Sequence, residues 1–320
     1  MANWTFICVS DIHVGTPRSF RYQQAWRENW LTARRQILEM SPDLILVAGD
    51  MTRDGCTHRF ELEQIKADLD ELPFPAYCIP GNHDVGDKIP VDSTPETNKL
   101  WGTRIRGEFV ELYRSVFGPS QWMVEHRGVR FSGFNALLAG SGLPEEAAMW
   151  QWLEAQAKRP PATRHVWVMH PALFVHDVDE PNYPPNEGRA SYFGVDRPHR
   201  DRMRHVFRRT GADLVLSGHL HARRQVNVDD ITFQYAPSTA FVGQELWPEG
   251  DTSLGFLRCD VSDAGIEVTF IPLARTSDAT GYGPGGNPPL EGRDYTVAWE
   301  KPALDLDEQR LPRGVAGDGP

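Results

Sequence analysis

Short hydrophobic runs alternate with segments of helical periodicity in the first part of the chain. The runs at 6–9, 44–48 and 76–79 are apolar throughout, which is typical of strands buried on both faces. Between them, at about 21–40 and 58–72, apolar residues recur every three or four positions, which predicts amphipathic helices. This β-α-β-α-β order indicates parallel strands joined by right-handed crossovers.

The second part of the chain continues with further strands and helices. The predicted strands are at 121–125, 130–134, 165–169 and 213–217, and the predicted helices are at 144–158 and 196–210. From about 223 to 272 the pattern indicates β-hairpins, with turns at 229–230 and 263–265. We expect the hairpins to form a second sheet packed on the first. The predicted fold is α/β: a four-layer α-β-β-α sandwich of two mixed sheets flanked by helices.

Three stretches lack either pattern. Residues 84–103 and 177–189 show no periodicity, and long irregular loops in compact domains are usually functional or disordered. After about 275 the chain is rich in Gly and Pro. We therefore predict a folded domain over 1–275 and a Gly/Pro-rich C-terminal extension over 276–320.

Charge and composition limit the classes of partner. The formal net charge is −11, which opposes nucleic acid and anionic membranes, so we expect neither as a partner. No run approaches the roughly 18 apolar residues of a membrane span, and no basic segment of a signal peptide is present. The four cysteines form no C-x-x-C pair, which is typical of reduced thiols. We expect a cytoplasmic protein. The sequence leaves open whether it forms a homo-oligomer.

Residues able to bind metal ions follow five of the predicted strands. They are Asp11, His13, Asp50, Asn82, His170, His219 and His221, and His83 and Asp84 stand beside Asn82. Because ligands bind at the carboxyl ends of the strands in an open α/β sheet, we expect these side chains to converge at one edge. Glycines at 49, 81 and 218 allow tight turns and close backbone approach there.

The donor types of this set favour a pair of transition metal ions. Asp and Asn offer oxygen, His offers nitrogen, and no Cys takes part, so Mn, Fe, Zn, Co or Ni remain open. Seven ligands are too many for one metal ion with an open position, and they suit two ions that share a carboxylate. In Asp11-x-His13 and in His219-x-His221, we expect both side chains to lie on the same side of an extended segment.

The ordered motifs resemble the calcineurin-like metallophosphoesterase superfamily, whose pattern is D-x-H, G-D, G-N-H-[DE], H and G-H-x-H. The resemblance covers about residues 5–222. It implies that Asp50 bridges two metal ions. It assigns one ion to Asp11, His13, Asp50 and His221, and the other to Asp50, Asn82, His170 and His219. It further implies that His83 faces the substrate phosphate as general acid or electrostatic stabiliser, and that Asp84 orients His83.

The resemblance also implies the chemistry. Two divalent or trivalent metal ions, Mn, Fe or Zn, would activate a hydroxide that attacks the phosphorus of a small phosphate ester. Residues 49–55 and 79–84 are similar to bacterial class III cyclic-nucleotide and glycerophosphodiester phosphodiesterases, which favours a phosphodiester. The Tyr192-Phe193 region resembles a eukaryotic metallophosphoesterase-domain phosphatase, which keeps a monoester as the alternative. A non-catalytic scaffold of this fold would need a defective metal site, and no motif is missing here.

Loops beside such a site often bind substrate. His176, which follows His170 by six residues, is therefore a candidate for substrate binding, and so are Arg189 and Tyr192. The alternative for each is an ordinary solvated or capping residue.

Overall fold

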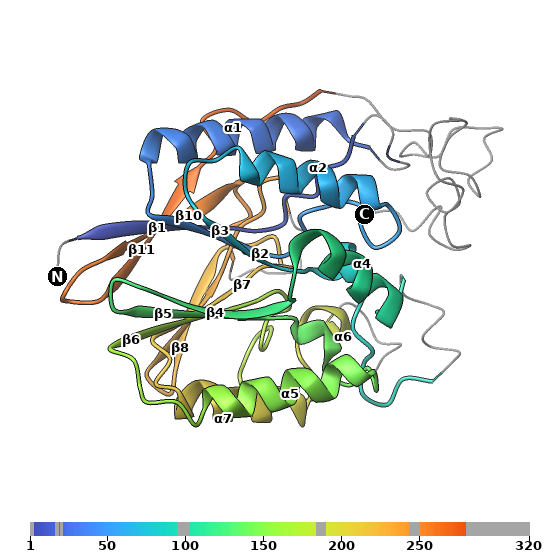
Figure 1. Cartoon of the computed structure of the whole chain (residues 1–320), viewed down its shortest axis with the longest axis vertical. Coiled ribbons are helices and arrows are strands. Elements are labelled where there is room, and N and C mark those ends of the chain that lie inside the picture. Colours follow the sequence, from blue (N-terminus) through green and yellow to red (C-terminus); the bar gives the residue numbers. More distant parts are fainter. Residues whose placement is uncertain are drawn as a thin grey trace.

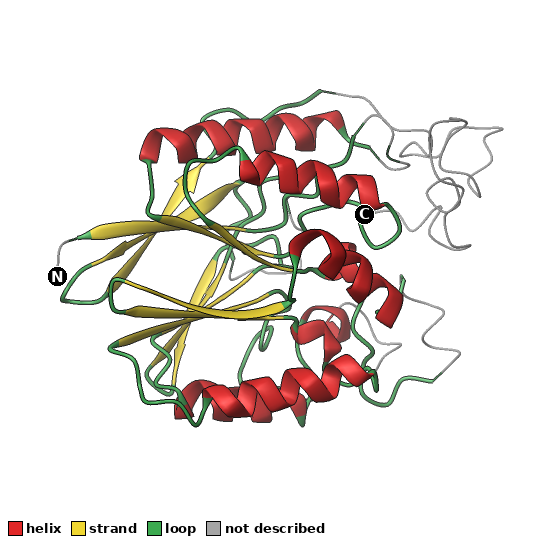
Figure 2. Ribbon diagram, in the orientation of Figure 1, coloured by secondary structure: helices red, strands yellow, loops and turns green. Residues whose placement is uncertain are grey.

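Two β-sheets lie face to face at the centre of the molecule, with helices on both outer sides (Figure 1). The computed structural model describes residues 3–16, 19, 22–94, 103–183, 190–242 and 250–279. Figure 2 shows helices over the first sheet and further helices under the second. They are α1 (Gln24–Met40) and α2 (Arg59–Asp70) above, and α5 (Pro144–Gln156) and α7 (His199–Arg209) below. The predicted four-layer sandwich is therefore confirmed.

The first sheet has five strands in the order β11-β10-β1-β2-β3. The strands are β1 (Trp4–Val9), β2 (Leu44–Ala48), β3 (Ala76–Ile79), β10 (Gly255–Val261) and β11 (Ile266–Pro272). β1, β2 and β3 are parallel, whereas β10 runs antiparallel to β1. The carboxyl ends of the three parallel strands consequently lie at the same edge.

The second sheet has six strands in the order β4-β5-β6-β7-β9-β8. The strands are β4 (Gln121–His126), β5 (Val129–Phe134), β6 (Arg164–Met169), β7 (Leu214–Ser217), β8 (Arg224–Val228) and β9 (Ile231–Tyr235). Its central strands β5, β6, β7 and β9 are parallel, and β4 and β8 close the two edges in antiparallel pairing.

The expectation that the hairpins of 223–272 form the second sheet was right for one hairpin and wrong for the other. The β8-β9 hairpin joins the second sheet, and the β10-β11 hairpin joins the first sheet beside β1. The turn at Asp229 and Asp230 is present, with both residues at positive φ (55° and 62°), as a tight two-residue hairpin turn requires. A turn depends on adjacent residues, so it could be predicted. The sheet that a hairpin joins depends on strands far away in the sequence.

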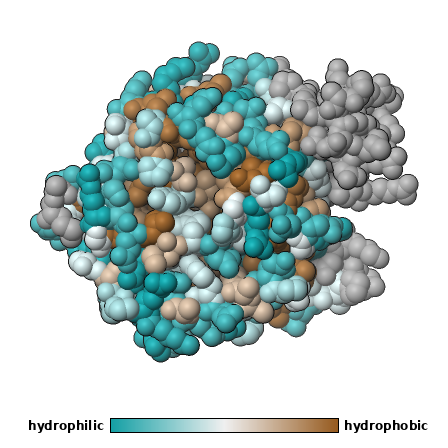
Figure 3. Space-filling view, viewed as in Figure 1, coloured by the Kyte–Doolittle hydropathy of each residue, from teal (hydrophilic) through white to brown (hydrophobic). Residues whose placement is uncertain are grey.

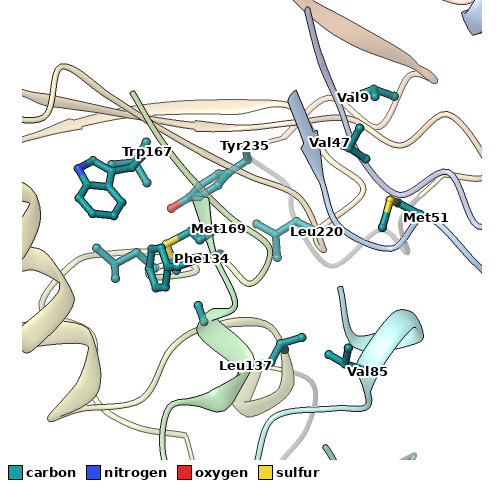
Figure 4. Close-up of a cluster of buried hydrophobic side chains, with 14 of the residues drawn as sticks. Val9, Val47, Met51, Val85, Phe134, Leu137, Trp167, Met169, Leu220 and Tyr235 are labelled. Atoms are coloured by element: carbon teal, nitrogen blue, oxygen red, sulfur yellow. The ribbon is translucent and has the colours of Figure 1, made fainter. Parts of the chain in front are cut away.

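Alternate residues of the central strands serve two separate cores. Phe6 and Cys8 of β1 point into the apolar layer between the sheets, whereas Ile7 and Val9 point towards the helices. The residues labelled in Figure 4, among them Val9, belong to the core under the helices. Burial of both faces explains why these strands are apolar throughout. The face of the molecule shown in Figure 3 is mostly hydrophilic, with hydrophobic residues among the polar ones.

The described residues form three further α-helices. They are α3 (Asn82–Val85), α4 (Gly107–Phe117) and α6 (Ala190–Phe193). α4 was not among the predicted elements, although Phe109, Val110 and Tyr113 on its buried side recur at helical spacing. In the described part of the chain, no helix has the length and apolarity needed to cross a membrane.

Candidate metal centre

The predicted ligands come together in two overlapping groups. Asp11, His13, Asp50 and His221 form the first group, whose ligand atoms all lie within 4.8 Å of one another. The second group consists of Asp50, His170 and His219 under the same criterion. All six side chains are buried.

The Asp50 carboxylate belongs to both groups and lies between them. Its Oδ2 atom lies 3.6 Å from His13 Nε2 in the first group and 3.3 Å from His170 Nε2 in the second. Its Oδ1 atom accepts a hydrogen bond of 2.8 Å from the backbone N–H of His83. One oxygen is thus fixed by the backbone, and the other faces both groups.

Backbone carbonyls fix which imidazole nitrogen can act as a ligand. Nδ1 of His170 lies 2.8 Å from the Ala48 carbonyl, and Nδ1 of His221 lies 3.1 Å from the Phe241 carbonyl. A carbonyl only accepts, so both Nδ1 atoms carry a proton and Nε2 is left for coordination. Nε2 of His221 faces Asp11 Oδ1 at 3.2 Å, and Nε2 of His170 faces Asp50 Oδ2 at 3.3 Å. Each such pair of a ring nitrogen and a carboxylate oxygen can share a proton or bind a cation, so the donor set fits metal ions.

The electrostatics of the cluster also favour a cation. Burial raises the pKa of the Asp11 and Asp50 carboxyls, but nearby histidines outweigh it, so both values are lowered and both groups stay charged. Burial disfavours a charged His170, yet the Asp50 carboxylate raises its pKa to about 9. Burial lowers the pKa of His219 to about 3 and that of His13 well below its usual value, so these rings stay neutral. Such neutral rings beside two carboxylates are suited to metal binding.

Five of the predicted ligands adopt a left-handed backbone conformation, which side chains other than glycine rarely adopt. These are Asp11, His13, Asp50, His219 and His221, with φ between 46° and 71°. The expectation of extended Asp-x-His and His-x-His segments was therefore wrong. Asp11 and His13 do converge on one group, but through turns, and His219 and His221 enter different groups.

Close packing of the loops explains the glycines of the motifs. A Cβ atom on Gly81 would lie 2.1 Å from the backbone nitrogen and from Oδ1 of Asp50. On Gly218 it would lie 1.9 Å from Ser10 Oγ and 2.5 Å from Asp11 Oδ2. Gly49 adds a positive φ of 86° to a similar clash with the His170 ring. The predicted need for close approach at these glycines is confirmed.

Asn82 lies at the second group, at the start of α3. Its Oδ1 atom is 3.0 Å from His170 Nε2, and its Nδ2 atom donates to Tyr192 Oη at 2.6 Å. The Tyr192 ring also lies 4.6 Å from the His219 ring, measured between centroids. Tyr192, predicted to bind substrate, therefore touches residues of the candidate centre.

His83 and Asp84 lie as neighbours in α3 but face different partners. His83 Nδ1 lies 2.7 Å from the Arg53 carbonyl, and the His83 ring packs 4.7 Å from the His13 ring. The Asp84 carboxylate accepts hydrogen bonds from the backbone N–H groups of Met51, Thr52 and Gly81 and from the Thr52 hydroxyl. The predicted contact in which Asp84 orients the His83 ring is thus replaced by one from the Arg53 carbonyl. Asp84 instead ties the loop after β2 to α3.

The other two substrate-binding predictions have different outcomes. The His176 side chain is exposed, and its backbone N–H donates to Glu180 Oε2 at 2.8 Å. Arg189 lies outside the described residues. Neither finding tests substrate binding, so both stay predictions.

An aromatic pair beside the first group was not predicted. Phe241 lies 4.3 Å from the His221 ring and stacks on Trp26 at 4.6 Å, between centroids. Trp26 fits the helical pattern of α1 as an ordinary packing residue. Phe241 follows β9 by six residues and acts partly through its backbone carbonyl, for which a sequence carries no signal.

Comparison with known proteins agrees with this geometry. Residues 5–223 match the family model for calcineurin-like phosphoesterases. The serine/threonine-protein phosphatase CPPED1 of Danio rerio is 25% identical, over 68% of this chain and 69% of the relative. The 3',5'-cyclic-nucleotide phosphodiesterase alr5338 of Nostoc sp. is 23% identical, over 73% and 77% respectively.

A solved structure shares the fold at low sequence identity. The purple acid phosphatase PPD1 of yellow lupin superposes with a TM-score of 0.55 at 12% identity, covering 87% of this chain and 53% of its own. The family model spans more than half of the chain and includes every predicted ligand. The chain therefore belongs to the calcineurin-like phosphoesterase family and is a metal-dependent phosphoric ester hydrolase.

Proposed function

We propose that the chain hydrolyses a small phosphodiester at a dinuclear metal centre. The observation that carries this proposal is the position of Asp50, whose carboxylate is common to both groups of ligand atoms. The first ion would be held by Asp11, His13, Asp50 and His221. The second would be held by Asp50, Asn82, His170 and His219. When bound, the two ions, Mn, Fe or Zn, supply Lewis acidity and a water nucleophile at neutral pH.

The protein's own residues supply orientation and a proton. The Ala48 and Phe241 carbonyls hold the imidazoles of His170 and His221 with Nε2 turned inwards. His83 is half-buried beside His13, and its Nδ1 is engaged by the Arg53 carbonyl. A proton that His83 delivers to a leaving oxygen would therefore leave from Nε2.

The two relatives named above act on different classes of phosphate ester. One is a cyclic-nucleotide phosphodiesterase and the other a protein phosphatase, at similar identity. Residues 49–55 and 79–84 favour the diester by their similarity to the bacterial phosphodiesterases. A phosphomonoester is the second candidate, because the phosphatase relative covers a comparable share of the chain.

Metal analysis coupled to hydrolysis tests the proposal. We expect about two metal ions per chain, and faster cleavage of bis(p-nitrophenyl) phosphate than of p-nitrophenyl phosphate with added Mn²⁺. A preference for the monoester would move the assignment to a phosphatase. A chain that binds no metal and cleaves neither compound would refute the dinuclear centre.

A further inference from the structure

Asn82 can enter a metal site in two ways that are almost identical in shape. Rotation of its amide by 180° exchanges the carbonyl oxygen, which can bind a cation, for the NH₂ group, which cannot. The correct rotamer must therefore be selected by neighbours that distinguish donor from acceptor. In this protein two acceptors lie on one side of Asn82: Asp87 Oδ1 at 2.9 Å from Nδ2, and Tyr192 Oη at 2.6 Å.

We propose that Asp87 and Tyr192 are positioning residues that hold the carbonyl oxygen of Asn82 towards the second group. This inference rests on the proposed function, in which Asn82 binds the second metal ion. With Nδ2 engaged by both acceptors, Oδ1 is directed to His170, whose Nε2 lies 3.0 Å away. Tyr192 also makes a side-chain hydrogen bond to Asp87, so its hydroxyl donates to the carboxylate and accepts from the amide.

The three side chains form a closed triangle in which every hydrogen has one acceptor. The Asp87 carboxylate accepts a hydrogen bond from each of its two partners, Asn82 and Tyr192. Asn82 and Asp87 are nearly fully buried, at 5% and 6% exposure, so water does not compete well for these bonds. A flipped amide would place Oδ1 against two oxygen atoms, which the buried triangle disfavours.

The loops that carry the triangle are tied together by a buried ion pair. Lys88, next to Asp87, donates to Asp196 Oδ2 at 2.9 Å, and Asp196 follows Tyr192 by four residues. Both side chains of the pair are below 10% exposed. The Asp87 backbone is also fixed, because its N–H and C=O bond with Thr103 and Ile105. Asp87 and Tyr192, 105 positions apart in the sequence, are therefore held beside Asn82 by the fold.

Metal titration of variants tests this role separately from activity. We expect the wild-type chain to take up two Mn²⁺ ions, measured by isothermal titration calorimetry and by electron paramagnetic resonance. In Asp87→Ala we expect the second ion to bind about 10–100-fold more weakly, as for other groups that orient metal ligands, with the first ion unaffected. Asp87→Asn keeps one acceptor oxygen for Asn82. Its affinity for the second ion should therefore lie between those of the wild type and Asp87→Ala.

Tyr192→Phe tests the same role with the ring retained, and remains informative if Asp87→Ala does not fold. It should weaken the second ion by a smaller factor, because Asp87 still accepts from Asn82. Tyr183→Phe is its control, since Tyr183 donates to Glu180 at 3.3 Å and not to Asn82. Asp68→Ala controls for loss of a buried carboxylate, because Asp68 accepts from Trp30 at 3.0 Å, away from the site. Both controls should bind two ions as the wild type does.

The outcomes separate the two proposals. Wild-type affinity for both ions in Asp87→Ala and Tyr192→Phe would overturn the positioning role and leave the dinuclear centre standing. Equal weakening of both ions would also overturn it, because the effect would then be general. Absence of metal binding in the wild type would refute the proposed function itself.

Discussion

Substituting Gly81 by alanine isolates the steric contact between two loops of the site. Gly81 has φ −101° and ψ −178°, which any residue adopts, so alanine adds no backbone strain. Its Cβ atom would lie 2.1 Å from Asp50 N and Oδ1, whereas real contacts stay beyond 3.0 Å. The loops must therefore separate by about 0.9 Å, the difference between these distances. We expect Asp50 to move out of both groups.

The cost follows from what this separation breaks. Overpacking of a close-packed region costs about 1–3 kcal/mol. Losing the 2.8 Å hydrogen bond from His83 N–H to the Asp50 carboxylate adds about 1.5–3 kcal/mol. We therefore expect Gly81→Ala to lower the free energy of unfolding by about 2.5–6 kcal/mol, the sum of the two contributions. This is a large part of the roughly 5–15 kcal/mol of a typical domain.

Urea unfolding with chelator present, together with metal analysis, measures both effects. Gly107→Ala is the matched control, because its Cβ would meet nothing nearer than Glu145 Oε1 at 3.7 Å. That variant should stay within about 1 kcal/mol of the wild type and keep its metal ions. A Gly81→Ala protein with wild-type stability and metal content would refute the steric argument.

Four further outcomes are expected. Asp50→Ala should lose both metal ions by metal analysis and all hydrolysis, whereas His83→Ala should keep its metal but turn over on the order of 100-fold more slowly. Mn²⁺ at 100 times its Kd should stabilise the fold by about 2.7 kcal/mol per site. The melting temperature should rise accordingly, and a chelator should reverse the rise. Burial lowers the pKa of His165 to about 4 from 6.5, so the unfolded chain binds the proton first as the pH falls. Stability present above pH 6.5 should therefore be lost towards pH 4, by about 3 kcal/mol, and urea unfolding of His165→Gln should show a correspondingly flatter pH profile.

The central strands were predictable because each of them is buried on both faces. Residues 44–48, for example, pack between the sheets with one face and under the helices with the other. A run without polar residues directly indicates burial on both faces of the strand. The sheet that each hairpin joins was not predictable, because β10 pairs with β1 across more than 240 residues. The residues Asp229 and Asp230 specify a hairpin turn, but they do not specify which strand the hairpin pairs with.

The convergence of the ligands was predictable from their position after the strands, but the local geometry was not. Alternation in Asp11-x-His13 suggested an extended segment, whereas tertiary hydrogen bonds hold both residues at positive φ. The backbone N–H of Asp11 donates to the Gly49 carbonyl at 3.1 Å, and that of His13 to the Asp50 carbonyl at 3.0 Å. These partners are backbone atoms of another loop, which sequence patterns do not report. The contacts of the Asp84 carboxylate with the backbone N–H groups of Met51 and Thr52 were missed for the same reason.

The pairing of β1 with β10 has a consequence for synthesis on the ribosome. Trp4 pairs with Val261, so the first strand made waits for almost the last strand of the described domain. Until then the nascent β1 has an open edge, which other chains can pair with. The loop after β1 is also completed late, because Ser238 Oγ donates to the Asp11 carbonyl at 2.8 Å. The edge that carries the candidate ligands is therefore complete only after the chain has been made past Ser238.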